Sequence, residues 1–204
     1  MDKQHSDDDR TRTSPVLSQG TIVQNYRILE KIGSGGMGEV YLAEDTELDR
    51  RVALKFLPTH MCRDDDCRAR FRREAQAVAK LNHPNVITIY QVSEYQGRPF
   101  FAMELVEGQS LRELSASKDL DVERIIELAI QICDGLGAAH EKQVIHRDIK
   151  PSNIVIDVYG RPKVLDFGLA AIQGYEQLTK TGSTLGTIRY MSPEQVGGKT
   201  VDKR

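Results

Sequence analysis

Short apolar runs alternate with glycine-rich or charged turns in the part of the chain that follows residue 25. Three successive runs, residues 26–32, 39–44 and 51–57, have the composition of β-strands. Two more, residues 86–94 and 99–106, are apolar and β-prone and are joined across Gln96-Gly97, which favours a hairpin. The pattern predicts a five-stranded antiparallel sheet.

A helical period replaces this pattern in two longer segments. Residues 64–81 begin with acidic side chains, which suit the positive end of a helix dipole, and continue at helical spacing until His83-Pro84. Residues 121–141 also follow the helical period, and two short β runs, 153–157 and 162–165, come after them. The positions expected along the core face of the second helix are Val122, Ile125, Ala129, Ile132, Cys133 and Leu136. These elements predict an α+β fold in two lobes, the second mainly helical.

The first 24 residues are rich in Asp, Arg, Ser and Thr and have few large apolar side chains, so we expect a disordered tail. The whole chain of 204 residues is 39% hydrophobic and 28% charged, as in globular proteins. A net charge of −2 gives no reason to expect nucleic acid or an anionic membrane as partner. No apolar stretch approaches the roughly 18 residues of a spanning helix, so this segment is not expected to contact a membrane, although a longer parent protein could be membrane-anchored.

The three cysteines, Cys62, Cys67 and Cys133, make an odd count, and no apolar run opens the chain. Both observations favour a reducing, cytoplasmic setting. The spacing of Cys62 and Cys67 matches no zinc-binding pattern. The sequence does not indicate an oligomeric state.

The first segment that suggests chemistry lies between two predicted strands and runs Gly33-Ser34-Gly35-Gly36-Met37-Gly38-Glu39-Val40. A dinucleotide-binding loop would need a helix after its last glycine, whereas a strand on each side suits a loop whose backbone amides close over phosphates. Taken alone, the segment is more simply a glycine-rich hairpin.

A lysine follows on the next predicted strand, where alternation places Ala53 and Lys55 on one face. An ammonium group there could bind phosphate oxygens and pair with a carboxylate of the following helix, for which Glu74 is the candidate. Taken alone, Lys55 is more simply an ordinary strand lysine and Glu74 a solvated helix residue.

Three further motifs complete a recognisable order. His146-Arg147-Asp148-Ile149-Lys150-Pro151-Ser152-Asn153 is followed by Asp166-Phe167-Gly168 and later by Ser192-Pro193-Glu194. With the glycine-rich loop and Lys55, these motifs have the order found in protein kinases. The chain resembles the eukaryotic-like protein kinase family from residue 26 to about residue 199, and the segments GSGGMGEVYLAED and RYMSPEQ are most similar to bacterial serine/threonine members.

The resemblance implies a bilobal kinase fold, with residues 25–204 forming the kinase domain, and transfer of the γ-phosphoryl group of ATP to Ser or Thr hydroxyls of protein substrates. It makes Asp148 and Lys150 catalytic, with Asp148 accepting or orienting the hydroxyl proton. Asn153 and Asp166 would be ligands of Mg²⁺, with Mn²⁺ as an alternative. Lys150 and Thr187 match the serine/threonine subgroup.

The same resemblance assigns the nucleotide contacts. Met103 would border a back pocket, Glu104 to Val106 would form the hinge that binds adenine, and apolar side chains would sandwich the ring. The implied set is Ile32, Gly33, Ser34, Gly35, Gly36, Met37, Gly38, Glu39, Val40, Ala53, Lys55, Glu74, Met103, Glu104, Val106 and Val155.

A polar stretch between Gly168 and Ser192 resembles an activation loop. We expect autophosphorylation at Thr179 and Thr181, with Arg147 as the cationic partner of the new phosphate. An unmodified loop is the alternative.

The sequence departs from the family pattern at Ser192, where Ala is usual, and at its end, because kinases of this type continue with several further helices. We therefore expect an incomplete second lobe and an exposed apolar face on the helix at 121–141. Two other functions remain open, namely a nucleotide-binding fragment without transfer and a scaffold derived from a kinase. The presence of Lys55, Asp148, Asn153 and Asp166 argues against the scaffold.

Overall fold

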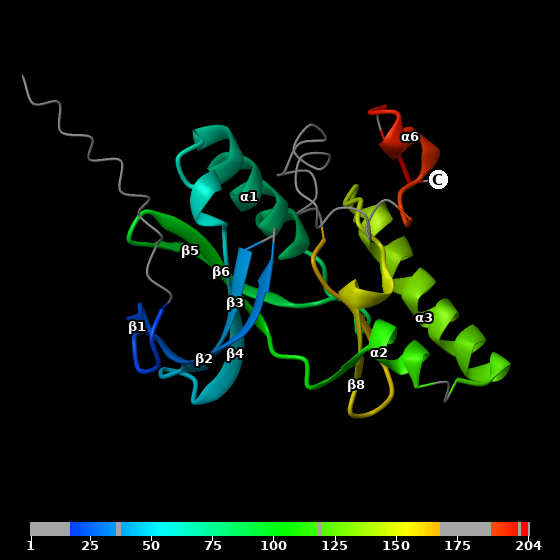
Figure 1. Cartoon of the computed structure of the whole chain (residues 1–204), viewed down its shortest axis with the longest axis horizontal. Helices are drawn as coiled ribbons and strands as arrows, with labels where there is room; N and C mark the ends of the chain where they lie inside the picture. Colours follow the sequence, from blue (N-terminus) through cyan, green and yellow to red (C-terminus); the bar gives the residue numbers. More distant parts are fainter. Residues whose placement is uncertain (1–16, 36–37, 118–119, 168–188, 200, 204) are drawn as a thin grey trace, which may run out of the picture.

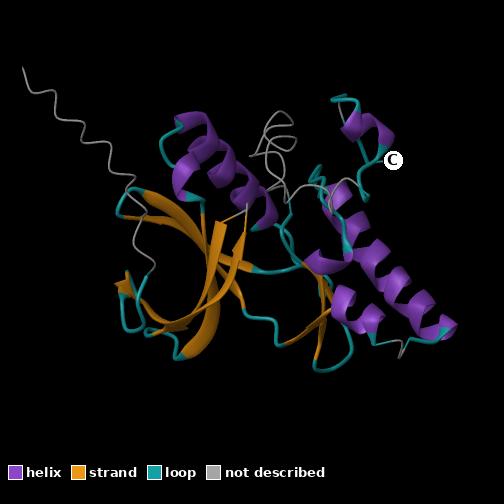
Figure 2. Ribbon diagram, viewed as in Figure 1, coloured by secondary structure: helices purple, strands orange, loops and turns teal. Residues whose placement is uncertain are grey.

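The first half of the chain forms a twisted antiparallel sheet with one helix against it (Figures 1 and 2). The computed structural model describes residues 17–35, 38–117, 120–167, 189–199 and 201–203. The sheet has six strands in the order β1-β2-β3-β4-β6-β5. Their bounds are β1 Ile22–Val23, β2 Tyr26–Gly35, β3 Gly38–Asp45, β4 Arg50–Phe56, β5 Ile89–Tyr95 and β6 Arg98–Glu104. The five predicted strands are present, and β1 is an addition.

Strand β4 is buried on both faces, which explains its apolar sequence. Val52, Leu54 and Phe56 enter an apolar cluster on one side of the sheet, where the Phe56 and Phe100 rings stack 5.1 Å apart. Ala53 belongs to a second cluster on the opposite side, which continues into the rest of the molecule. Strand alternation therefore places Lys55 on the side that faces the second lobe.

Helix α1 (Asp65–Val78) packs on that second side. Asp64 caps its N-terminus by accepting hydrogen bonds from the backbone N–H groups of Asp66 and Cys67. Its buried face includes Phe71, whose ring lies 5.3 Å from that of Phe101 on β6. A 3₁₀ turn (Thr59–Met61) precedes the helix. The helix ends three residues before the predicted position 81.

The second half of the chain combines helices with a small sheet in the order β7-β8-β9. Its elements are β7 (Gly108–Ser110), α2 (Leu111–Ala116), α3 (Val122–Glu141), a 3₁₀ turn (Pro151–Asn153), β8 (Ile154–Asp157), β9 (Pro162–Val164) and α6 (Pro193–Val196). The two-lobed α+β fold is confirmed (Figure 1).

The predicted disordered tail is too long at its C-terminal end. Residues 17–24 are described, and Val23 is fully buried and pairs with Tyr26. The backbone N–H of Leu17 donates to the Tyr41 hydroxyl at 3.2 Å. Val23 belongs to the apolar cluster of the adjoining sheet and Leu17 packs against it, whereas Ile22 is exposed. Residues 1–16 lie outside the described part of the chain.

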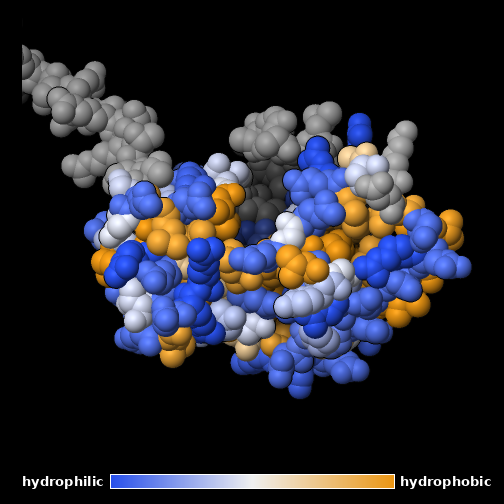
Figure 3. Space-filling model, turned by 90° about the horizontal axis from the view of Figure 1, so that it is seen from below, coloured by the Kyte–Doolittle hydropathy of each residue, from blue (hydrophilic) through white to orange (hydrophobic). Residues whose placement is uncertain are grey.

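The core face of α3 differs from the predicted one. Its buried residues are Leu128, Gly135 and Ala139, with Ile132 and Leu136 half-buried. The other face exposes the predicted core positions Val122, Ile125, Ala129 and Cys133, together with Ile126 and Ile130. The expected exposed apolar face is thus present, and Figure 3 shows apolar side chains gathered at the end of the molecule where α3 lies. None of the described helices combines the length and the apolar character needed to cross a bilayer.

Candidate active site

The glycine-rich segment forms the hairpin between β2 and β3, with Gly33 opposite Val40 and Gly35 opposite Gly38. Gly38 has φ of 115°, and a Cβ there would lie 2.0 Å from the carbonyl oxygen of Phe56. Gly38 is therefore required by close packing on β4. Gly35, by contrast, has nothing within 4 Å of an added Cβ, so its side of the hairpin is open to a ligand. Gly36 and Met37 lie outside the described residues.

Lys55 forms an ion pair between the two lobes. Its Nζ lies 2.6 Å from Oδ1 of Asp166, and the exposed fractions of the two side chains are 4% and 22%. The pair joins β4 to the segment after β9. A nearly buried ammonium group needs such a partner, because an unpaired charge is costly to bury.

Glu74 has a different partner from the one expected. Its Oε1 lies 3.7 Å from Nη1 of Arg147, and the Lys55–Asp166 pair leaves the predicted Lys55–Glu74 pair unformed. The prediction of that pair is wrong for this structure, because Lys55 pairs with the carboxylate of Asp166 and Glu74 pairs with the guanidinium group of Arg147. Burial raises the pKa of Glu74 above its usual value, and the nearby Arg147 and Arg73 oppose this shift.

Three polar side chains converge at the catalytic-loop motif. Lys150 Nζ lies 2.8 Å from Oδ2 of Asp148, whose side chain is buried. The Asn153 amide donates to both the backbone oxygen and Oδ2 of Asp148, each at 2.9 Å. Asp148 is therefore held in one orientation by two neighbours from the same loop.

The buried His146 side chain holds the backbone of this loop. It was not among the site residues named from the sequence. Its Nδ1 accepts the backbone N–H of Asp148 at 3.2 Å, so its Nε2 donates to the oxygen of Leu165 at 2.6 Å. The Phe167 ring lies 4.6 Å away. Burial lowers the pKa of His146 below its usual value, although the hydrogen bond to Leu165 and the charges of Asp166 and Asp148 oppose this. A neutral His146 thus connects the motifs around Asp148 and Asp166.

Two residues of the site have strained backbones. Arg147 and Asp166 have φ of 64° and 61°, in the left-handed region that non-glycine residues seldom adopt. The side chain of Gln195 on α6 donates to the Arg147 oxygen at 2.6 Å. Gln195 was also missed, although a signal existed: Ser192 and Gln195 form a capping box at the start of α6. The departure at Ser192 therefore provides a helix cap.

The predicted hinge follows Met103, which is buried and lines a small apolar pocket with Ala75, Val78 and Phe167. The backbone N–H of Glu104 donates to Thr88, and its side chain contacts Lys163. Ala53 is buried, Val40 and Val155 are half-buried, and Ile32 is exposed. Of the remaining candidates, Thr179, Thr181, Thr187 and Gly168 lie outside the described residues.

The oxygen atoms at Asn153 and Asp166 fit a divalent cation. Within the described part of the chain, both side-chain hydrogen bonds of Asn153 use its amide nitrogen, which leaves its Oδ1 for a metal, and the ion pair with Lys55 uses Oδ1 of Asp166. Among the described residues, no group of three or more His, Cys, Asp or Glu side chains could hold a metal by itself. Magnesium typically takes one or two protein carboxylates and completes its shell with phosphate and water, so the donor set fits it.

The fold and this arrangement define a protein kinase catalytic domain. The protein kinase domain family model matches residues 26–204, so the chain belongs to this family. It is 44% identical over 180 residues to the serine/threonine-protein kinase PrkC of Bacillus subtilis (strain 168), covering 88% of this chain and 28% of that protein. It is 40% identical over 198 residues to PknB of Mycobacterium leprae (strain TN), covering 94% of this chain and 31% of that protein.

Solved structures of kinase domains have the same fold. The PknI kinase domain of Mycobacterium tuberculosis matches with a TM-score of 0.74 and 29% identity, covering 92% of this chain and 70% of that one. The chain thus spans about a third or less of the length of these curated relatives and most of a solved kinase domain.

Proposed function

We propose that this chain is the nucleotide-binding and catalytic part of a serine/threonine protein kinase, acting on proteins in the cytoplasm. The observation that carries the proposal is the orientation of Asp148 by Lys150 and Asn153, opposite the Lys55–Asp166 pair. Its relatives are named serine/threonine-protein kinases, which supports the choice of acceptor.

In the proposed reaction, a Ser or Thr hydroxyl oxygen attacks the γ-phosphorus of ATP and the bond to the β–γ bridging oxygen breaks, releasing ADP. Asp148 orients the hydroxyl and accepts its proton. Lys150 lies beside Asp148, where its ammonium group can neutralise charge on the transferring group. Lys55 would bind nucleotide phosphate oxygens. Mg²⁺ held by Asn153 and Asp166 would offset phosphate charge.

We also propose autophosphorylation at Thr179 and Thr181. Arg147 is suited to bind the resulting phosphate, because its guanidinium group already lies beside the cleft, 3.7 Å from Glu74. Peptide mass spectrometry after incubation with ATP tests this: phosphate should be found at these positions in the unaltered chain and not in Asp148→Asn. Phosphate confined to other residues would contradict it.

The second candidate is a fragment that binds nucleotide without transferring phosphate. The separation of Lys55 from Glu74 and the exposed apolar face of α3 favour it. The scaffold has no specific observation in its favour.

Radiolabelled phosphate transfer from ATP with Mg²⁺ to the chain and to a generic basic protein distinguishes the candidates. Incorporation should vanish in Asp148→Asn and Lys55→Met but persist in the matched controls Asp134→Asn and Lys142→Met, whose side chains are exposed on or just after α3. If ATP raises the melting temperature while no phosphate is incorporated, the nucleotide-binding candidate replaces the kinase.

A further inference from the structure

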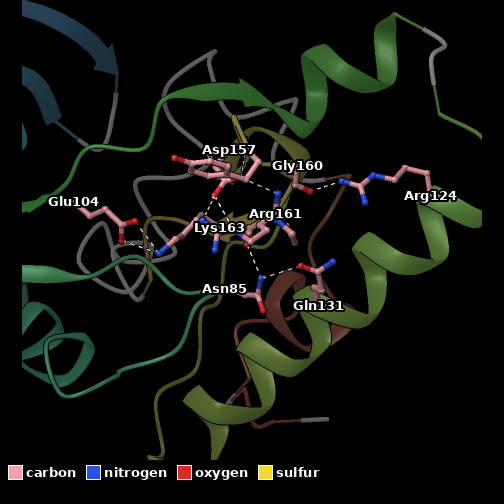
Figure 4. Close-up of polar contacts among 10 residues, drawn as sticks. Asn85, Glu104, Arg124, Gln131, Asp157, Gly160, Arg161 and Lys163 are labelled. Carbon is pink, nitrogen blue, oxygen red and sulfur yellow. Dashed lines mark hydrogen bonds and ion pairs between the residues drawn. The ribbon is translucent and has the colours of Figure 1, made fainter.

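The segment that follows α1 in the first lobe lies beside the second lobe. Val86 and Val164 form a parallel bridge, with the Ile87 N–H donating to Val164 at 3.0 Å and the Val164 N–H donating to Asn85 at 2.8 Å. The buried Asn85 side chain donates to Pro162 at 2.9 Å. Figure 4 shows Asn85 between α3 and the small sheet, within reach of Gln131. Strand β9 is thereby attached to the first lobe by backbone hydrogen bonds.

An ion pair lies at the edge of these contacts. Lys163 Nζ contacts both carboxylate oxygens of Glu104, at 2.8 and 2.9 Å (Figure 4). The exposed fractions of the Lys163 and Glu104 side chains are 13% and 23%, so water screens the pair less than it screens a surface pair. Glu104 is held further by Thr88, which accepts from its backbone N–H at 2.9 Å and donates to its Oε2 at 3.3 Å.

The two charged residues connect the parts of the proposed nucleotide site. Glu104 is the last residue of β6 and the first of the proposed hinge. Lys163 is paired in the small sheet with Val155, the proposed floor of the adenine site, and precedes Asp166 by three residues. The pair therefore fixes the proposed hinge relative to both the adenine floor and the proposed metal ligand.

We infer that Lys163 is a positioning residue for the nucleotide, acting through its ion pair with Glu104. This inference rests on the proposed function. A site whose two sides are already held at the right separation loses less conformational entropy when a ligand binds, so its affinity is higher. When Lys163 is neutralised, β9 stays attached through residues 85–87, but the proposed hinge is held less firmly against the adenine floor, and the nucleotide must order it.

The experiment measures the Kd of a fluorescent ATP analogue with Mg²⁺ for the purified 204-residue chain. Lys163→Met and Glu104→Gln should each weaken binding by about 5- to 10-fold, the lower part of the range for coupled sites. The charge exchange Glu104→Lys with Lys163→Glu should recover most of the loss. Arg161→Met is the matched control, because Arg161 lies in the same hairpin and pairs with Asp157, away from the hinge. It should leave the Kd unchanged.

Melting temperatures recorded in parallel separate positioning from a purely structural role. An unchanged Kd in both single variants, or a lowered melting temperature with unchanged Kd, would overturn the inference. Glu104→Gln decides the matter if Lys163→Met does not fold. Binding without phosphate transfer by the unaltered chain would overturn the proposed activity and leave this comparison valid, whereas no binding by the unaltered chain would overturn both.

Discussion

Glu74 and Arg147 form an ion pair between the two lobes, with 3.7 Å between Oε1 and Nη1, while Lys55 holds Asp166 at 2.6 Å. The longer pair is the weaker one, and Glu74 carries a raised pKa because of its burial. A phosphate near Arg147 would compete for its guanidinium group. Glu74 would then be available to Lys55, as the resemblance to other kinases implies.

The first prediction concerns the Glu74→Gln variant. Its free energy of unfolding should equal or exceed that of the unaltered chain, because the substitution removes a partly buried charge with one distant partner. Its phosphate transfer should fall about tenfold or more, the typical loss when charge stabilisation in a transition state is removed. Urea denaturation and transfer assays measure the two quantities.

Glu127→Gln is the matched control, since Glu127 pairs with Arg124 at the surface of α3. It should change neither quantity. If phosphate transfer is unchanged in Glu74→Gln, the reaction does not require Glu74 to leave Arg147 and pair with Lys55.

The second prediction compares two glycines of α3. A Cβ at Gly135 would lie 3.2 Å from both Cβ and the backbone oxygen of Asn85, and that oxygen is fixed by the Val164 N–H. Gly135→Ala should lower the free energy of unfolding by about 1–3 kcal/mol through overpacking. Gly137 has nothing within 4 Å, so Gly137→Ala should raise it by about 0.5–1 kcal/mol. Equal effects in denaturant titrations would refute this placement of α3 against Asn85.

The third prediction concerns pH. Burial lowers the pKa of His146, so the unfolded chain binds a proton more readily than the folded one as the pH falls through the usual histidine range. The stability due to neutral His146 is fully present above about pH 6.5 and is lost as the pH falls toward the lowered value. This single group contributes a slope of at most about 1.4 kcal/mol per pH unit.

Denaturation of the unaltered chain and of His146→Gln at pH 5.5 and 7.5 measures this contribution. The variant should be less stable at pH 7.5 and should lose less stability on acidification. Parallel losses in both proteins would assign the acid sensitivity to other groups.

Much of the fold could be predicted from the sequence because its signals are local. The strands between residues 26 and 56 are short β-prone runs separated by glycine-rich or charged turns, and Asp64, an acidic residue at the predicted helix start, caps α1. The candidate catalytic residues could be named from the sequence because their motifs are short and contiguous. Strand β1 was missed because two residues give no period.

The partners of these residues could not be predicted, since they depend on packing between distant segments. Lys55 pairs with Asp166 and not with Glu74 because of the way in which the two lobes pack against each other. The same holds for Lys163, which precedes a motif but belongs to none. On α3, the helical period was visible, yet apolar residues surround much of the helix, so the period alone did not identify the buried side.

The fourth prediction uses that helix. Ile130 is 57% exposed and Leu128 is 2% exposed, although both are apolar and lie two residues apart. Ile130→Gln should reduce self-association of the purified chain without lowering its stability, because it removes part of an exposed apolar face. Leu128→Gln should lower the free energy of unfolding by about 2–5 kcal/mol, as for other large core deletions. Light scattering at rising concentration and thermal melting measure the two effects, and unchanged scattering in Ile130→Gln would contradict the first.

The bridge between Val86 and Val164 links the two lobes at a point that the sequence does not indicate. The chain passes from the first lobe to the second after Glu104, where β6 ends. Residues 85–87 precede this point in the sequence, yet they are hydrogen-bonded to β9 of the second lobe. The backbone therefore joins the two lobes twice, once covalently and once through hydrogen bonds, in addition to the side-chain ion pairs between them. A single peptide-bond cleavage in the hinge would leave them associated, and rotation of one lobe against the other has to occur about two attachments instead of one.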